Sequence, residues 1–117
     1  MSNASKRKGT GWEVAIRDYF LDRSVPVHRN PTNGAFDIGD LAVEIDSVHY
    51  VIEAKATKSL DLPGFLLEAE KEAGHYAELH RKSLDVVRPI VVIKRRSHGT
   101  GRAYVVQELD WWLRDHG

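Results

Sequence analysis

The chain has 117 residues, of which 42% are hydrophobic and 29% are charged, and 17 basic side chains balance 17 acidic ones. This length and composition suit one compact domain with a core and argue against disorder of the whole chain. The absence of cysteine excludes a disulfide framework and a zinc–thiolate site. The balanced charge argues against a protein that holds nucleic acid by electrostatics alone. No apolar run approaches the roughly 20 residues that cross a bilayer, and no signal peptide is visible, so we expect a cytoplasmic protein without membrane contact.

Patterns at the beginning of the chain predict one helix and one short extended segment. Apolar residues recur at helical spacing over residues 10–22. Thr10 followed by Glu13 matches a capping box at the start of a helix. Residues 25–29 are expected to be extended, and residues 1–7 are expected to form a flexible tail.

Residues 40–55 carry the most informative pattern. Apolar and polar residues alternate on both sides of Asp46-Ser47, which predicts two strands joined by a two-residue turn. In that register each apolar residue of one strand faces an apolar residue of the other, in the pairs Leu41–Ile52, Val43–Tyr50 and Ile45–Val48. A slip of one residue would separate all of these pairs, so the register is well specified.

The remainder of the chain predicts four further elements. They are a helix over 64–82, a buried strand over 89–94, a strand over 103–107 and a short helix over 109–114. The order is therefore αβββαβ followed by a strand and a short helix, which is an α/β arrangement. Because no internal repeat or linker is visible, residues 1–117 are expected to form a single domain.

The same hairpin register has a chemical consequence. It places Asp40 opposite Glu53, on the face away from the Leu41–Ile52 pair, and directly opposed residues have Cβ atoms about 4.5–5.5 Å apart. Lys55 follows Glu53 by two residues and therefore shares its face. Two opposed carboxylates repel each other, and a divalent cation offsets that repulsion better than one lysine can. Hard oxygen ligands suit magnesium or manganese.

These residues resemble the signature of the PD-(D/E)xK nucleases. Asp40 is followed, after an apolar strand, by Glu53-Ala54-Lys55, and an N-terminal helix bears a glutamate. The chain is similar to archaeal Holliday-junction resolvases and to small phage or prophage resolvase-like nucleases. That resemblance implies a restriction-endonuclease-like mixed β-sheet flanked by helices. It also implies Mg²⁺ (with Mn²⁺ as a substitute), a DNA substrate, and a bacterial, archaeal or phage-infected cell.

By the same resemblance, Glu13, Asp40 and Glu53 would be metal ligands and Lys55 would be the catalytic lysine. Glu13 has an alternative role, because a glutamate three residues after Thr10 can simply cap the helix. Asp37 competes with Asp40 as the aspartate of the motif. We prefer Asp40 because the register pairs it with Glu53, and we keep Asp37 as an auxiliary ligand.

The second helix offers one further candidate. Glu68, Glu70 and Glu72 are expected to lie mainly on a solvated helix face. In related nucleases a residue of this helix supports the site, and Glu70 is the candidate for that role. The histidines have no metal-ligand spacing, and Trp111 and Trp112 are expected to pack in the structure.

Two basic clusters are candidates for contact with DNA. They are Lys6, Arg7 and Lys8 near the N-terminus and Lys94, Arg95 and Arg96 after the buried strand. Lysine and arginine hold the phosphate backbone through sequence-independent attraction. A solubilising tail and a solvated strand end are the alternatives for the first and second cluster.

The sequence as a whole predicts a magnesium-dependent endonuclease that hydrolyses DNA phosphodiester bonds. A Holliday junction or another branched DNA is the candidate substrate, and a homodimer is expected because a four-way junction offers two symmetric strands. A non-catalytic nucleic-acid-binding module of the same fold is the alternative. A third possibility is a protein-interaction subunit whose acidic helix over 64–82 contacts a partner.

Overall fold

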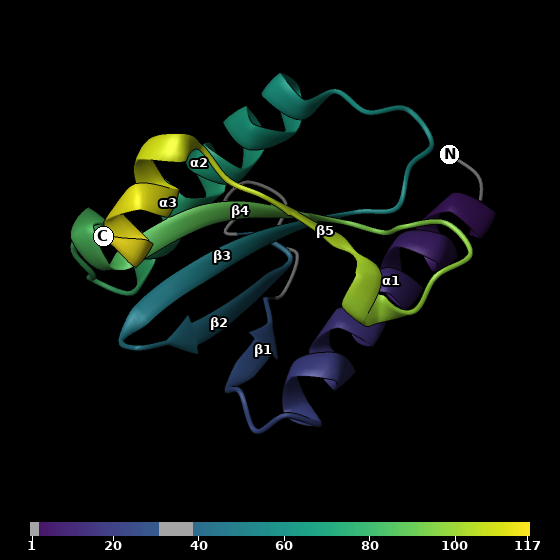
Figure 1. The fold of residues 1–117 in the computed structure, drawn as a ribbon, viewed down its shortest axis with the longest axis horizontal. Helices are drawn as coiled ribbons and strands as arrows, with labels where there is room; N and C mark the ends of the chain where they lie inside the picture. Colours follow the sequence, from purple (N-terminus) through teal and green to yellow (C-terminus); the bar gives the residue numbers. More distant parts are fainter. Residues whose placement is uncertain (1–2, 31–38) are drawn as a thin grey trace.

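The computed structural model describes residues 3–30 and 39–117, and it describes side chains at 11–27, 29–30 and 39–117. A five-stranded sheet in the order β1-β2-β3-β4-β5 forms its centre (Figure 1). The strands are β1 Val27–Arg29, β2 Leu41–Ile45, β3 Val48–Lys55, β4 Val87–Ile93 and β5 Tyr104–Val106. The helices are α1 Asn3–Leu21, α2 Leu62–Leu79 and α3 Leu109–His116, with short 3-10 turns at Leu84–Val86 and Thr100–Arg102.

The strand pairing makes the sheet mixed. Strands β3 and β4 are parallel, because α2 crosses over between them, and the other neighbouring pairs are antiparallel. The expected order αβββαβ followed by a strand and a helix is confirmed, and so is the flanked mixed sheet.

The β2–β3 hairpin has the expected register. All three apolar pairs form as predicted: Leu41–Ile52, Val43–Tyr50 and Ile45–Val48. Asp46 and Ser47 both have positive φ, of 53° and 67°. A tight two-residue hairpin turn that matches strand twist requires positive φ at both positions.

Two helices bury the opposite faces of the sheet. On one face, Trp12 and Ile16 of α1 pack with Leu41, Ile52 and other strand residues. On the other face, α2 contributes Ala69, Ala73, Tyr76 and Ala77, which pack against the strand residues Val51, Val87 and Val91. Figure 1 shows α1 and α2 on opposite sides of β3. Side chains that alternate along β3 therefore point alternately toward α1 and toward α2.

Helix α1 begins earlier than the sequence predicts. It starts at Asn3, so residues 3–7 are helical and the expectation of a flexible tail there is wrong. Thr10 lies inside the helix, so its expected capping box with Glu13 is wrong as well. Lysine, arginine and alanine favour helix, which lets the helix continue through this basic segment.

Helix α2 also begins two residues before the expected boundary. Asp61 caps it, because its carboxylate accepts a hydrogen bond of 3.1 Å from the backbone N–H of Gly64. Pro63 occupies the first turn, where its missing N–H costs nothing. Within the described part of the chain, no helix is long and apolar enough to cross a membrane.

A buried ion pair fixes α3 against the start of β4. The Arg88 Nε–Asp115 Oδ1 distance is 2.8 Å, and both side chains are almost fully buried. Asp115 Oδ2 also accepts hydrogen bonds from the Tyr50 hydroxyl and the Gln107 amide, at 2.9 and 3.1 Å. The Arg88 guanidinium lies over the Trp111 ring, 4.6 Å from its centroid. Trp111 therefore has the packing role that the sequence predicts.

Replacement of Asp115 by alanine is expected to destabilise the fold strongly. The change leaves the Arg88 guanidinium buried without its carboxylate, which costs about 3–5 kcal/mol of unfolding free energy. Asp110→Ala, at an exposed position of the same helix, should cost about 1 kcal/mol or less. Urea denaturation measures both values, and equal effects of the two changes would contradict the role given to Asp115.

Candidate active site

Glu53 lies at the centre of a cluster of ionisable side chains. It is on β3, beside Val51 on the face that α2 covers, and it is only 6% exposed. One of its oxygens, Oε2, is 3.0 Å from Lys55 Nζ. The other, Oε1, is buried and has no hydrogen-bond partner among the described residues. A buried carboxylate oxygen without a partner is costly, so this atom marks a place where a ligand would be stabilising.

The charge of Glu53 is incompletely balanced. Burial and, after it, the nearby Asp40 charge raise the pKa of its carboxyl to about 7, against opposing contributions from Glu72 and Lys55. The ion pair with Lys55 would by itself lower this pKa. Desolvation and Asp40 together outweigh it, so the folded protein favours the protonated form of Glu53.

Lys55 shares the face of Glu53, as the strand alternation predicts. Its Nζ also lies 3.3 Å from Glu68 Oε2, and 4.8 Å from the centroid of the Phe65 ring. Burial lowers the pKa of Lys55, but Glu53 and Glu68 outweigh that effect and raise it overall. Lys55 therefore stays a cation at neutral pH.

Asp40 lies beyond the last regular pair of the hairpin. The pairing ends at Leu41–Ile52, and the Asp40 backbone N–H donates to the Ile52 carbonyl at 3.1 Å. This differs from the expected direct pairing of Asp40 with Glu53. Gly39, with φ of 90°, turns the backbone just before Asp40.

The side chain of Asp40 stays at the cluster nevertheless. Its Oδ2 accepts a hydrogen bond of 2.8 Å from the backbone N–H of Ala54, the residue between Glu53 and Lys55. Its charge raises the pKa of both Glu53 and Glu13. The two carboxylates of the motif thus meet at the same end of β3, by a different backbone route from the one the sequence predicts.

Glu13 reaches the cluster from α1. Its Oε1 is 3.5 Å from Arg29 Nη2. Burial raises its pKa, Asp40 raises it further, and Arg29 opposes both effects. Glu13 is therefore close enough to Asp40 for their charges to interact, and it lies inside α1 rather than at the start of the helix.

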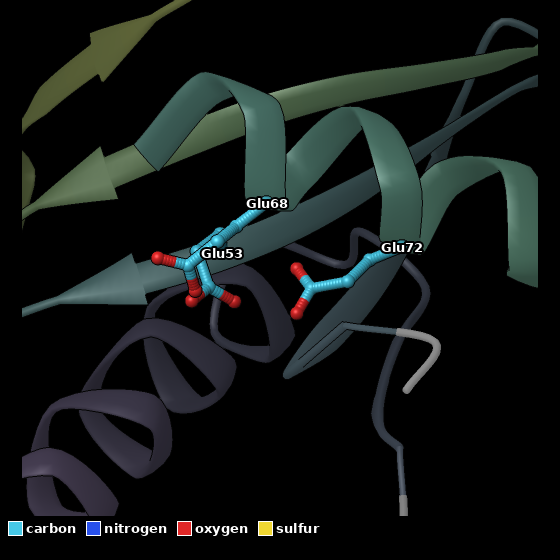
Figure 2. A group of neighbouring side chains, drawn as sticks. All are labelled: Glu53, Glu68 and Glu72. Carbon is cyan, nitrogen blue, oxygen red and sulfur yellow. The ribbon is translucent and has the colours of Figure 1, made fainter. Parts of the chain in front are cut away.

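Helix α2 adds two glutamates that sequence reasoning placed on a solvated face. Carboxylate oxygens of Glu53, Glu68 and Glu72 lie within 4.8 Å of one another. Figure 2 shows Glu68 and Glu72 extending from α2 toward Glu53 on β3. Glu72 is 3% exposed, so the expectation of a solvated face is wrong for it. Glu70, the candidate of the sequence analysis, is exposed and is not part of this group.

Helical spacing could have identified Glu72. It follows the buried Ala69 by three residues and precedes the buried Tyr76 by four, so it must lie on the face that packs on the sheet. Glu68 precedes Glu72 by four residues and lies one turn away on the same side.

The structure describes only some of the remaining predicted site residues. Asp37 lies outside the described residues, and the side chains of Lys6, Arg7 and Lys8 do as well. Lys94, Arg95 and Arg96 follow β4 and line a cavity with Lys58. Because the backbone N–H of Lys94 donates to the Lys55 carbonyl at 2.9 Å, this basic cluster adjoins the carboxylates.

The donor set fits a hard divalent cation. Carboxylate oxygens are the ligands that Mg²⁺ and Mn²⁺ prefer. The buried Glu53 Oε1 has no partner among the described residues, and the surplus of carboxylates over lysine is the charge that a cation would neutralise.

The mixed sheet with helices on both faces is a fold that the chain shares with a solved structure. Among solved structures, the chain is similar to Hjc, a Holliday junction resolvase from the archaeal hyperthermophile Archaeoglobus fulgidus. The TM-score is 0.52 at 16% sequence identity, over 90% of this chain and 93% of that one. No protein-family model and no curated protein sequence matches the chain. The likeness establishes the fold.

Replacement of Glu53 by glutamine is expected to stabilise the metal-free protein at alkaline pH. A carboxyl whose folded pKa is raised binds more protons when folded, so stability falls as pH rises from about 4.5 to about 7. Glutamine removes that loss, which is worth about 1–3 kcal/mol at pH 8 and little at pH 4.5. Urea denaturation in chelator at both pH values measures it.

Glu78→Gln, at an exposed position of α2, is the matched control and should leave the pH dependence unchanged. A Glu53→Gln variant that is less stable than the wild type at pH 8 would show that the ionised carboxylate is well compensated in the folded protein.

Proposed function

We propose that the protein is a divalent-metal-dependent endonuclease that hydrolyses phosphodiester bonds of DNA, with branched or junction DNA as its substrate. The observation that carries the proposal is the buried Glu53 carboxylate, which lies between a lysine, the motif aspartate and the glutamates of α2. The likeness in fold to an archaeal Holliday junction resolvase supports it.

Glu53 and Asp40 are the residues that would hold Mg²⁺ or Mn²⁺. Glu13 on one side and Glu72 and Glu68 on the other are further ligands or hydrogen-bond partners of its waters. A bound divalent cation of this kind polarises a phosphoryl oxygen and lowers the pKa of a water. Oxygens of Glu53, Glu68 and Glu72 already lie within 4.8 Å of one another, so a single ion could contact all three.

Lys55 acts as a fixed cation in this proposal. Glu53 and Glu68 hold its ammonium at 3.0 and 3.3 Å and raise its pKa. A lysine that stays protonated cannot take a proton from water. It can stabilise the negative charge that builds on the phosphate, and it can orient the attacking water by donating to it.

Basic residues beside the cluster would hold the DNA backbone. Lys94, Arg95 and Arg96 lie next to the end of β3 where Lys55 lies. Backbone contacts of this kind position a nucleic acid without reading its sequence.

Nicking of labelled four-way junction, flap and linear DNA with and without Mg²⁺ tests the function. The wild type should cleave a branched substrate only with the metal, and Glu53→Ala and Lys55→Ala should each lower the rate at least about 100-fold. Glu78→Ala is the control and should cleave like the wild type. Metal-independent cleavage, or equal rates for all four proteins, would contradict the proposal.

We propose, in addition, that two copies act together on a symmetric junction. Exposed apolar side chains line a cavity of about 570 Å³ between β5, α3 and the hairpin, among them Ile45, Val105, Leu109 and Trp112. A second copy would cover this surface and remove its apolar side chains from water.

Light scattering with and without junction DNA measures the oligomeric state. The wild type should show twice the mass of one chain, and Leu109→Lys should shift it toward the mass of one chain. Leu67→Lys changes an equally exposed leucine on α2 and should have no effect. A wild type that stays monomeric in both conditions would refute the dimer.

A further inference from the structure

A cationic cavity lies beside the carboxylate cluster. Its volume is about 560 Å³, within the range of ligand-binding pockets. Four of its ten lining residues are basic, namely Lys58, Lys94, Arg95 and Arg96, and none is acidic. In a chain whose charges balance overall, this local excess of positive charge favours an anionic occupant.

The cavity also offers surfaces that a simple anion would not use. Ile93 and Leu60 line it with apolar side chains, and Tyr104 places an aromatic ring that is half exposed at its border. The Arg95 guanidinium lies 5.7 Å from the centroid of the Tyr104 ring. An aromatic ring next to a guanidinium is the combination on which proteins stack nucleobases.

Strand pairing fixes the distance between this ring and the carboxylate cluster. Lys55 pairs with Ile93, and Ile93 pairs with Tyr104, so the three residues form one row across the sheet. Paired residues point to the same face. Neighbouring strands lie about 4.8 Å apart, which puts the Tyr104 backbone roughly 10 Å from that of Lys55. A DNA strand with one phosphate at Lys55 can therefore place a neighbouring nucleotide in the cavity.

We propose that this cavity receives one unpaired nucleotide of the DNA strand, with its base stacked on Tyr104 and its phosphate held by the basic side chains. The assignment rests on the proposed function, because it takes DNA as the substrate. It adds a substrate class: DNA with unpaired nucleotides next to the bond that is cut, in preference to intact duplex. A base inside a duplex is stacked between its neighbours and leaves no face for the tyrosine ring.

The first experiment measures binding without any metal, so that no hydrolysis is needed. Fluorescence anisotropy in chelator gives the dissociation constants of a short oligothymidylate, of the same backbone with abasic sites, and of a blunt duplex. Tyr104→Ala should weaken binding of the oligothymidylate about tenfold. It should change binding of the abasic strand and of the duplex less than twofold. Tyr104→Phe keeps the ring and should bind like the wild type.

The second experiment separates the basic side chains from the ring. Arg96→Ala should weaken binding of the abasic strand and of the oligothymidylate by the same factor. It should also reduce the steepness of log affinity against log salt concentration by about 0.7. Arg81→Ala removes an exposed arginine that does not line the cavity and should leave the slope unchanged.

Two results would overturn the inference. In the first, Tyr104→Ala binds the oligothymidylate as tightly as the wild type does. In the second, Tyr104→Ala loses the same factor of affinity for the oligothymidylate and for the abasic strand. These outcomes are distinguishable from failure of the proposed function. A protein that shows the Tyr104 effect but cleaves nothing with Mg²⁺ keeps the nucleotide site and loses the nuclease.

Discussion

The structure depends on the burial of one carboxylate among others. Glu53 is almost fully buried, and its position on β3 is fixed by the apolar pairs of the hairpin and by the parallel pairing with β4. Lys55 neutralises only part of the negative charge that Asp40, Glu68 and Glu72 place around it. A fold selected for stability alone would favour an apolar residue at such a position. The free-energy cost of burying the Glu53 carboxylate therefore indicates that its charge has a function.

The surroundings of Glu53 come from three separate elements. Strand β3 contributes Glu53 and Lys55, the irregular backbone after Gly39 brings in Asp40, and α2 supplies Glu68 and Glu72 from the opposite layer. The hydrophobic packing of α2 on the sheet sets the position of its two glutamates. Packing and electrostatics are therefore coupled here, because the contacts that stabilise the fold also hold the like charges together.

The sequence predicted the parts of the site that depend on local periodicity. Alternation along residues 41–52 fixed the hairpin register, and it placed Glu53 and Lys55 on one face. It did not predict the course of the chain at Asp40, because a glycine with positive φ breaks the alternation there. Glu72 was assigned to a solvated face because charged residues on a helix usually are solvated, although its spacing from Ala69 and Tyr76 pointed to the sheet. The cavity beside Tyr104 is lined by residues of a loop and two strands. These residues are far apart in the sequence, so local periodicity could not predict the cavity.

A crystal grown with Mn²⁺ tests the central claim most directly, since anomalous scattering locates the ion without reference to activity. Our account predicts an anomalous peak within about 2.0–2.3 Å of Glu53 Oε1, with an Asp40 oxygen among the other ligands. A crystal saturated with Mn²⁺ that shows no peak at Glu53, while the carboxylate keeps its buried position, would contradict the account.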